Sequence, residues 1–91
     1  MTDVAGIGQP LHLLPGLGPT MAGWLQQVGI ETEADLRAIG SITAYRRLKH
    51  WDRKRVSLNA LWGLYSALTG IPLKDIDAAT KARLVFDVYG G

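Results

Sequence analysis

The chain has 91 residues, of which 47% are hydrophobic and 20% charged, with a formal net charge of +2 and no cysteine. This length and composition are those of one folded domain with one hydrophobic core, which excludes a multidomain protein and a disordered chain. Without cysteine there is no disulfide, thiolate metal site or cysteine nucleophile.

The first part of the chain predicts a flexible arm followed by a glycine-rich turn. Residues 1–9 contain two glycines and no helical period, so we expect an N-terminal arm over 1–9 and one helical domain over 10–91. Residues 10–14 can form one short helical turn. The next five residues read Pro-Gly-Leu-Gly-Pro, and the glycines at 16 and 18 allow positive φ angles there.

Two short helices follow this turn. Pro19 suits the first position of a helix, and apolar residues at helical spacing predict that helix over about 19–28. Thr32 can cap the next helix, and Asp35 stands where the carboxylate of a capping box would reach back. Gly40 is expected to end this second helix.

Three further helices complete a predicted all-α fold. Ser41 can start a helix that runs to about residue 50, and Ser57 and Gly70 bound the most regular apolar stripe, which predicts the central core helix. Asp77 caps a last helix that is apolar over a wide arc. Because no segment alternates with a period of two residues, we expect no sheet but a compact five-helix domain of the helix-hairpin-helix or SAM-like type.

The glycine-rich turn is a candidate DNA contact. It delivers unpaired N–H groups at the amino end of a helix, where the free donors and the helix dipole together favour an anion. No lysine or arginine accompanies it at positions 20 and 21, so phosphate binding and a purely structural role as a tight helix connection both stay open. The candidate residues are Gly16, Leu17, Gly18 and Thr20.

A basic segment over residues 46–55 is a second candidate. It holds six Lys or Arg against Asp52 alone, whereas the rest of the chain is mildly acidic. Such a segment, with Tyr45 and Trp51 in or beside it, can follow a phosphate backbone by charge while a ring stacks on a base, and the alternative is an ordinary solvated face. The candidate DNA-binding residues are Arg46, Arg47, Lys49, Arg53, Lys54 and Arg55.

The wide apolar arc of the last helix predicts the competing function, a protein-interaction module or homodimer that does not bind DNA. An arc broader than one core contact requires can pack on a partner or on a second copy of the chain. The candidate interface residues are Leu84, Phe86, Val88 and Tyr89.

Neither an enzyme nor a metalloprotein is expected. His12 and His50 have no Cys, Asp or Glu at ligand spacing, and no paired carboxylates or nucleophile motif occur. We therefore predict no catalytic residues, no metal, no cofactor and no small-molecule substrate. The start of the chain has no basic and apolar leader and no apolar run reaches ~18 residues, so a cytoplasmic protein without membrane contact is expected.

The order of these motifs resembles the TfoX C-terminal domain family over about residues 13–85. Five blocks carry the resemblance: Leu14-Pro15-Gly16-Leu17-Gly18-Pro19, Val28-Gly29-Ile30 with Thr32 and Asp35-Leu36, Gly40 with Tyr45 and Leu48, Ser57-Leu58-Asn59 with Leu61, and Ala67-Leu68 with Gly70. The resemblance implies a compact helical domain without catalytic activity. It also implies a bacterial role in regulating transcription and DNA-uptake competence, with DNA or a protein of the transcription machinery as partner.

Overall fold

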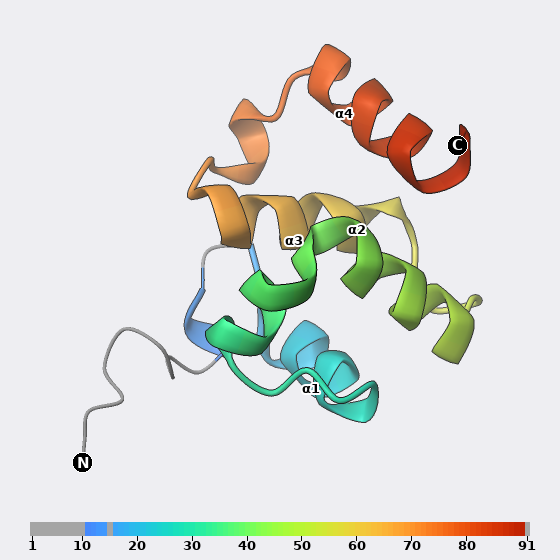
Figure 1. Ribbon diagram of the computed structural model, residues 1–91. Helices are drawn as coiled ribbons and strands as arrows, with labels where there is room; N and C mark the ends of the chain where they lie inside the picture. The colour runs from blue at the N-terminus through green and yellow to red at the C-terminus, as the bar shows by residue number, and fades with distance from the viewer. Residues whose placement is uncertain (1–10, 15, 91) are drawn as a thin grey trace.

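The computed structural model describes residues 11–14 and 16–90, and the predicted arm over residues 1–9 lies outside them. The described part of the chain is all-helical, with four α-helices and no β-strand. In chain order its elements are the short 3-10 turn η1 (Leu11–Leu13), α1 (Pro19–Gln27), α2 (Glu33–Trp51), α3 (Leu58–Thr69), the 3-10 turn η2 (Leu73–Asp75), α4 (Ala78–Val85) and the wider π turn η3 (Phe86–Gly90). Helices α2 and α3 pack together at the centre, with α1 on one side and α4 on the other (Figure 1).

The helix starts are those that the capping residues predict. The Thr32 hydroxyl accepts from the Asp35 N–H at 3.2 Å, and the Asp35 carboxylate accepts from the Thr32 N–H at 3.2 Å, which completes the capping box. Ser57 caps α3 through the Asn59 N–H, so Thr32 and Ser57 each satisfy a backbone donor that the helix itself leaves unpaired.

Over the described residues the structure has four α-helices where five were predicted, because the two helices expected on either side of Gly40 meet there without a loop and form α2. Gly40 does break the helical geometry, with φ 82° and ψ 167°, but helical geometry resumes at once and no connecting loop intervenes. The helices predicted on either side of Gly40 are therefore the two halves of one kinked helix, α2. At the other end, the predicted last helix stops being α-helical at Val85 and continues as η3.

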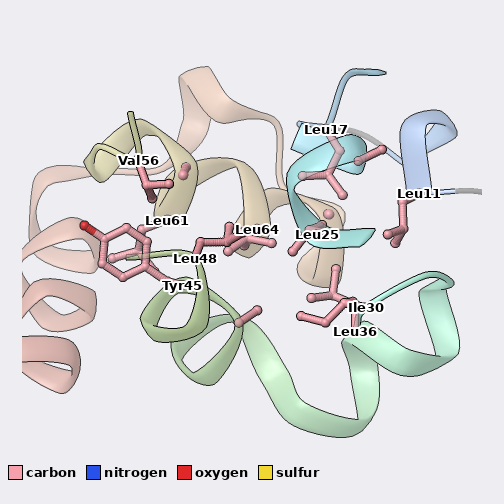
Figure 2. Packing of buried hydrophobic residues seen from close by; sticks show 14 of the residues in the cluster. Leu11, Leu17, Leu25, Ile30, Leu36, Tyr45, Leu48, Val56, Leu61 and Leu64 are labelled. Atoms are coloured by element: carbon pink, nitrogen blue, oxygen red, sulfur yellow. The ribbon is translucent and has the colours of Figure 1, made fainter. Parts of the chain in front are cut away.

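One apolar cluster joins the first three helices. Leu25 from α1, Leu48 from α2 and Leu61 from α3 are fully buried, and the predicted central helix α3 contributes more buried residues than the others. Figure 2 shows these side chains pointing toward one another in a continuous core. Their burial from water is the main source of stability for these three helices.

Helix α4 and η3 join this cluster at few points. Leu84 and Val88 are buried, whereas Phe86 and Tyr89 from the same predicted apolar arc are 64% and 60% exposed. The Lys81 ammonium lies 5.4 Å from the centre of the Trp62 ring on α3, which adds a cation–π contact. The wide arc is thus divided between a buried edge and an exposed one.

The turn before α1 lies in direct backbone contact with α3. Gly16 has φ +83°, and a Cβ placed on it would come within 2.8 Å of the Gly63 carbonyl oxygen and of the Ser66 Cβ. A Cβ on Gly63 would in turn lie 2.6 Å from the Gly16 carbonyl oxygen. Gly18 differs from the prediction of a second positive φ, because it is extended (φ −123°, ψ −175°) and nothing lies within 4 Å of its Cβ position. The two glycines of the turn therefore have different functions in the fold.

Alanine substitution should separate these two glycines. Gly16→Ala should destabilise the domain by about 1–3 kcal/mol, because it combines a positive φ with an occupied Cβ position. Gly18→Ala, the matched control, should change the unfolding free energy by less than about 0.5 kcal/mol. Gly63→Ala should also destabilise, although alanine favours a helix. Urea unfolding followed by circular dichroism measures all three, and equal effects at positions 16 and 18 would contradict the contact with α3.

The cap of α4 should make its stability depend on pH. Asp77 accepts from the Thr80 N–H at 2.8 Å, and hydrogen bonding by Thr80, first from its side chain and then from its backbone, lowers the pKa of Asp77 below its ordinary value. A lowered pKa means that the carboxylate stabilises the folded state above the ordinary carboxyl pKa and loses this effect as the pH falls.

Asp77→Ala should accordingly lower the melting temperature at about pH 7, whereas Asp77→Asn, which keeps an acceptor oxygen but not the charge, should lower it less. Near pH 2.5 the difference between Asp77→Ala and the parent chain should narrow. Thermal melts between about pH 2.5 and pH 7 test this prediction. A difference in melting temperature between the two chains that does not change with pH would show that the charge of Asp77 does not contribute.

Candidate nucleic-acid interface

The amino end of α1 presents unpaired backbone donors. Gly18 caps the helix without a side chain, the first turn holds no acidic residue, and the Ala22 N–H is the first to bond back, to the Gly18 carbonyl at 3.0 Å. Among the described residues, the N–H groups of Thr20 and Met21 have no acceptor. Of the predicted contact residues, Gly16 and Thr20 are exposed, Gly18 is half-buried, and the Leu17 side chain is buried in the core. The turn can therefore offer backbone N–H groups, and its leucine serves packing.

Two cations of the basic segment bond to main-chain carbonyls. Arg46 on α2 donates through Nη2 to the Asp87 and Val88 carbonyl oxygens, at 2.9 and 3.0 Å. Lys49, one turn later, donates through Nζ to the carbonyl oxygens of Arg53 and Val56. These bonds fix where the two side chains lie without cancelling their charge.

The segment's single acid pairs with one of its six cations. Asp52 lies 3.3 Å from the Arg55 Nε and also accepts from the Arg55 N–H. No other cation of residues 46–55 has a carboxylate within ion-pair distance in the described part of the chain, where the remaining pair is Arg37 with Glu33 on the first half of α2. Three of the unpaired cations have exposed side chains that make no hydrogen bond to the described residues, namely Arg47, Arg53 and Lys54.

A hollow of about 230 Å³ lies between α2 and η3 beside these cations. Its lining residues are Tyr45, Arg46, Lys49, His50, Arg53, Val88 and Tyr89. The Tyr45 and Tyr89 hydroxyls share a 2.9 Å hydrogen bond, and their rings meet edge to face at 6.3 Å. Burial, and then the neighbouring Tyr89 hydroxyl, raise the pKa of Tyr45, so this buried phenol stays protonated at neutral pH.

A second, apolar-walled hollow of about 360 Å³ lies between the end of α1 and the second half of α2. Val28 from the end of α1, Thr43, Arg46, Arg47 and His50 line it. Trp24 and Trp51 pack beside each other with ring centres 6.4 Å apart, and Trp51 is 37% exposed. Trp51 thus serves the packing of α1 on α2 while part of its surface stays open to solvent.

Sequence reasoning missed the Arg46 contact with η3 and the Tyr45–Tyr89 pair. Both join residues more than 40 positions apart, and neither leaves a local pattern in the sequence. In the described residues, no group of three or more His, Cys, Asp or Glu is arranged to hold a metal ion, and none of the helices is long and apolar enough to cross a membrane.

The fold and these surfaces define a small all-helical domain with a cationic flank. The model of the TfoX C-terminal domain family matches residues 8–87, so the chain belongs to this family.

Two crystal structures of Listeria monocytogenes proteins are similar to this chain, one described as uncharacterized and the other as of unknown function. The first, a triclinic form, shares 30% identity with a TM-score of 0.79 over 89% of this chain and 91% of that one. The second, a tetragonal form, shares 32% identity with a TM-score of 0.75 over 82% and 91%. Among curated proteins, no sequence matches the chain.

The Arg46 contact should hold the C-terminal turn against α2. Arg46→Ala should speed amide exchange in residues 86–90 about fivefold, since exposed charge-assisted hydrogen bonds of this kind contribute roughly 1 kcal/mol. Arg47→Ala removes the same charge from the next position and should leave exchange there unchanged. Hydrogen exchange followed by NMR distinguishes them, and equal protection in both variants would show that the apolar contacts of Val88 hold η3 alone.

Proposed function

We propose that this TfoX C-terminal domain is a non-enzymatic regulatory module that contacts DNA phosphates through residues 46–55, assisted by the turn at residues 16–20. One observation carries the proposal: five of the six cations in the basic segment have no carboxylate partner among the described residues. Uncompensated positive charge on one flank attracts a polyanion and gains free energy when counterions are released from it.

Two further features support contact with DNA. The unpaired Thr20 and Met21 N–H groups at the amino end of α1 suit a phosphate oxygen, as in turns of the helix-hairpin-helix type. The part-exposed ring of Trp51 stands at the carboxyl end of α2, next to the cations. A role in regulating competence and transcription is the biological setting that we attach to this proposal.

Fluorescence anisotropy with a labelled duplex tests DNA contact. Affinity should fall as salt rises, and Arg47→Ala and Lys54→Ala should each weaken binding and reduce the slope of log K against log salt by about 1. Lys74→Ala is the matched control, because it removes one exposed positive charge on η2, beyond the far end of α3. No binding at low salt, or equal loss in all three variants, would refute contact through the basic segment.

The exposed part of the last apolar arc supports a second candidate, a protein-interaction or self-association module. Phe86 is 64% exposed and Tyr89 60%, whereas Leu84 and Val88 are buried and can contribute no interface area without rearrangement. If this surface binds a second copy of the chain, sedimentation should show a dimer that Phe86→Ser dissociates. If it binds a protein of the transcription machinery instead, the chain alone should sediment as a monomer.

A further inference from the structure

We infer that the hollow between α2 and η3 is a binding site for one phosphate-type oxyanion, and that the bound anion ties the C-terminal turn to α2. The site is a discrete pocket, distinct from a diffuse cationic surface. That the bound anion is a phosphate of DNA rests on the proposed function, because Arg46, Lys49 and Arg53 belong to both the pocket and the proposed DNA-contact segment. A free phosphate ester would use the same pocket without any DNA contact.

The first argument is charge. Arg46, Lys49 and Arg53 line the hollow with three positive charges, His50 adds an imidazole ring, and no carboxylate of the described residues lines it. The one acid of the segment, Asp52, is engaged with Arg55. Like charges gathered around a small space repel one another, so an anion placed there gains from all three at once.

The second argument is that the anchored cations keep free donors. The two Nη2 hydrogens of Arg46 are used on the Asp87 and Val88 carbonyls, which leaves Nε–H and both Nη1–H groups. Lys49 uses two of its three ammonium hydrogens and keeps one. Because carbonyls already hold both cations in place, an anion would find ordered donors and would not have to order them itself.

The tyrosine pair adds one neutral donor. In the hydrogen bond between the Tyr45 and Tyr89 hydroxyls either phenol can be the donor, and the other keeps a free hydrogen. Both tyrosines line the hollow, so when Tyr45 is the donor the free hydroxyl hydrogen is that of Tyr89 and the site has donors from both of its walls. A spherical halide cannot use donors spread over two walls as a tetrahedral oxyanion with several acceptor oxygens can.

Size limits the ligand to a single anionic group. The volume of about 230 Å³ lies below the range of roughly 300–1,000 Å³ typical of pockets for drug-sized ligands, so the hollow holds a phosphate group and leaves the rest of a larger ligand outside. Inorganic phosphate, a phosphate monoester or one phosphate of a nucleic acid all present this chemistry.

A bound anion would connect α2 to η3, because each of them forms one wall of the hollow. Arg46 and Lys49 stand on α2, whereas Val88 and Tyr89 stand on η3, which the core holds at few points. An anion bound to both walls favours the docked state of η3 over the open one. It should therefore protect the amides of residues 86–90 from exchange.

NMR titration of the full chain with inorganic phosphate, at constant ionic strength and against chloride, tests the site. Saturable shifts should appear in residues 45–53 and 87–90, and exchange in residues 86–90 should slow. Arg53→Gln should weaken phosphate binding roughly tenfold, as expected for loss of a charge-assisted hydrogen bond. The neighbouring residue Lys54 does not line the hollow, so the phosphate affinity of Lys54→Gln should stay within about twofold of that of the parent chain. Arg53 makes no side-chain hydrogen bond to the described residues, so this variant should fold normally.

The outcomes separate this inference from the proposed function. Shifts that do not saturate, or equal weakening by the Arg53 and Lys54 substitutions, would overturn the pocket and leave DNA contact to be decided by the salt titration. Saturable phosphate binding that depends on Arg53, in a chain that binds no DNA at low salt, would uphold the pocket and refute DNA contact. If phosphate binds in the hollow, competition by oligonucleotides with and without a terminal phosphate identifies the ligand. Both oligonucleotides displace inorganic phosphate when the site binds a backbone phosphate, and only the phosphorylated one does so when the site binds a monoester. Neither displaces it when the site binds free phosphate.

Discussion

The backbone contact between Gly16 and Gly63 is the constraint on which the arrangement of the first three helices depends. A side chain at either position would occupy space that the other residue's carbonyl already fills. With both side chains absent, the turn lies on α3, Leu17 enters the core, and Pro19 starts α1 from a fixed point. The same contact leaves the unpaired amino end of α1 on the surface, so a packing requirement also determines where an anion could approach.

The kink at Gly40 divides α2 into two halves that serve different purposes. Before it, Leu36 is buried and the capping box fixes the start of the helix. After it, Tyr45 and Leu48 enter the core, and the basic residues between and beyond them therefore lie on the surface. Core packing of one face is thus what leaves the side chains of Arg46, Arg47 and Lys49 outside the core.

Local signals predicted the helix ends well, because capping and termination depend on residues within one turn of each other. Thr32 with Asp35, Ser57 and Asp77 act where the sequence places them. The stop predicted at Gly40 is a kink, with φ 82° and ψ 167°, at which two helical segments meet to form α2. The site was predictable in composition but not in shape: the carbonyls that hold Arg46 come from η3, 41 and 42 positions away in the chain.

The way in which these cations are held bears on what the surface can do. A carboxylate that accepted from Arg46 or Lys49 would satisfy the donors and cancel the charge, whereas a backbone carbonyl satisfies a donor and leaves the net charge in place. The Asp87 and Val88 carbonyls belong to the carboxyl end of the last helical stretch, where a cation is favoured by the helix dipole. This arrangement stabilises ordered arginine and lysine side chains next to one another at the cost of their mutual repulsion, which an external anion would relieve. Ordered, unneutralised cations are therefore what connects the fold of this domain to an anionic partner.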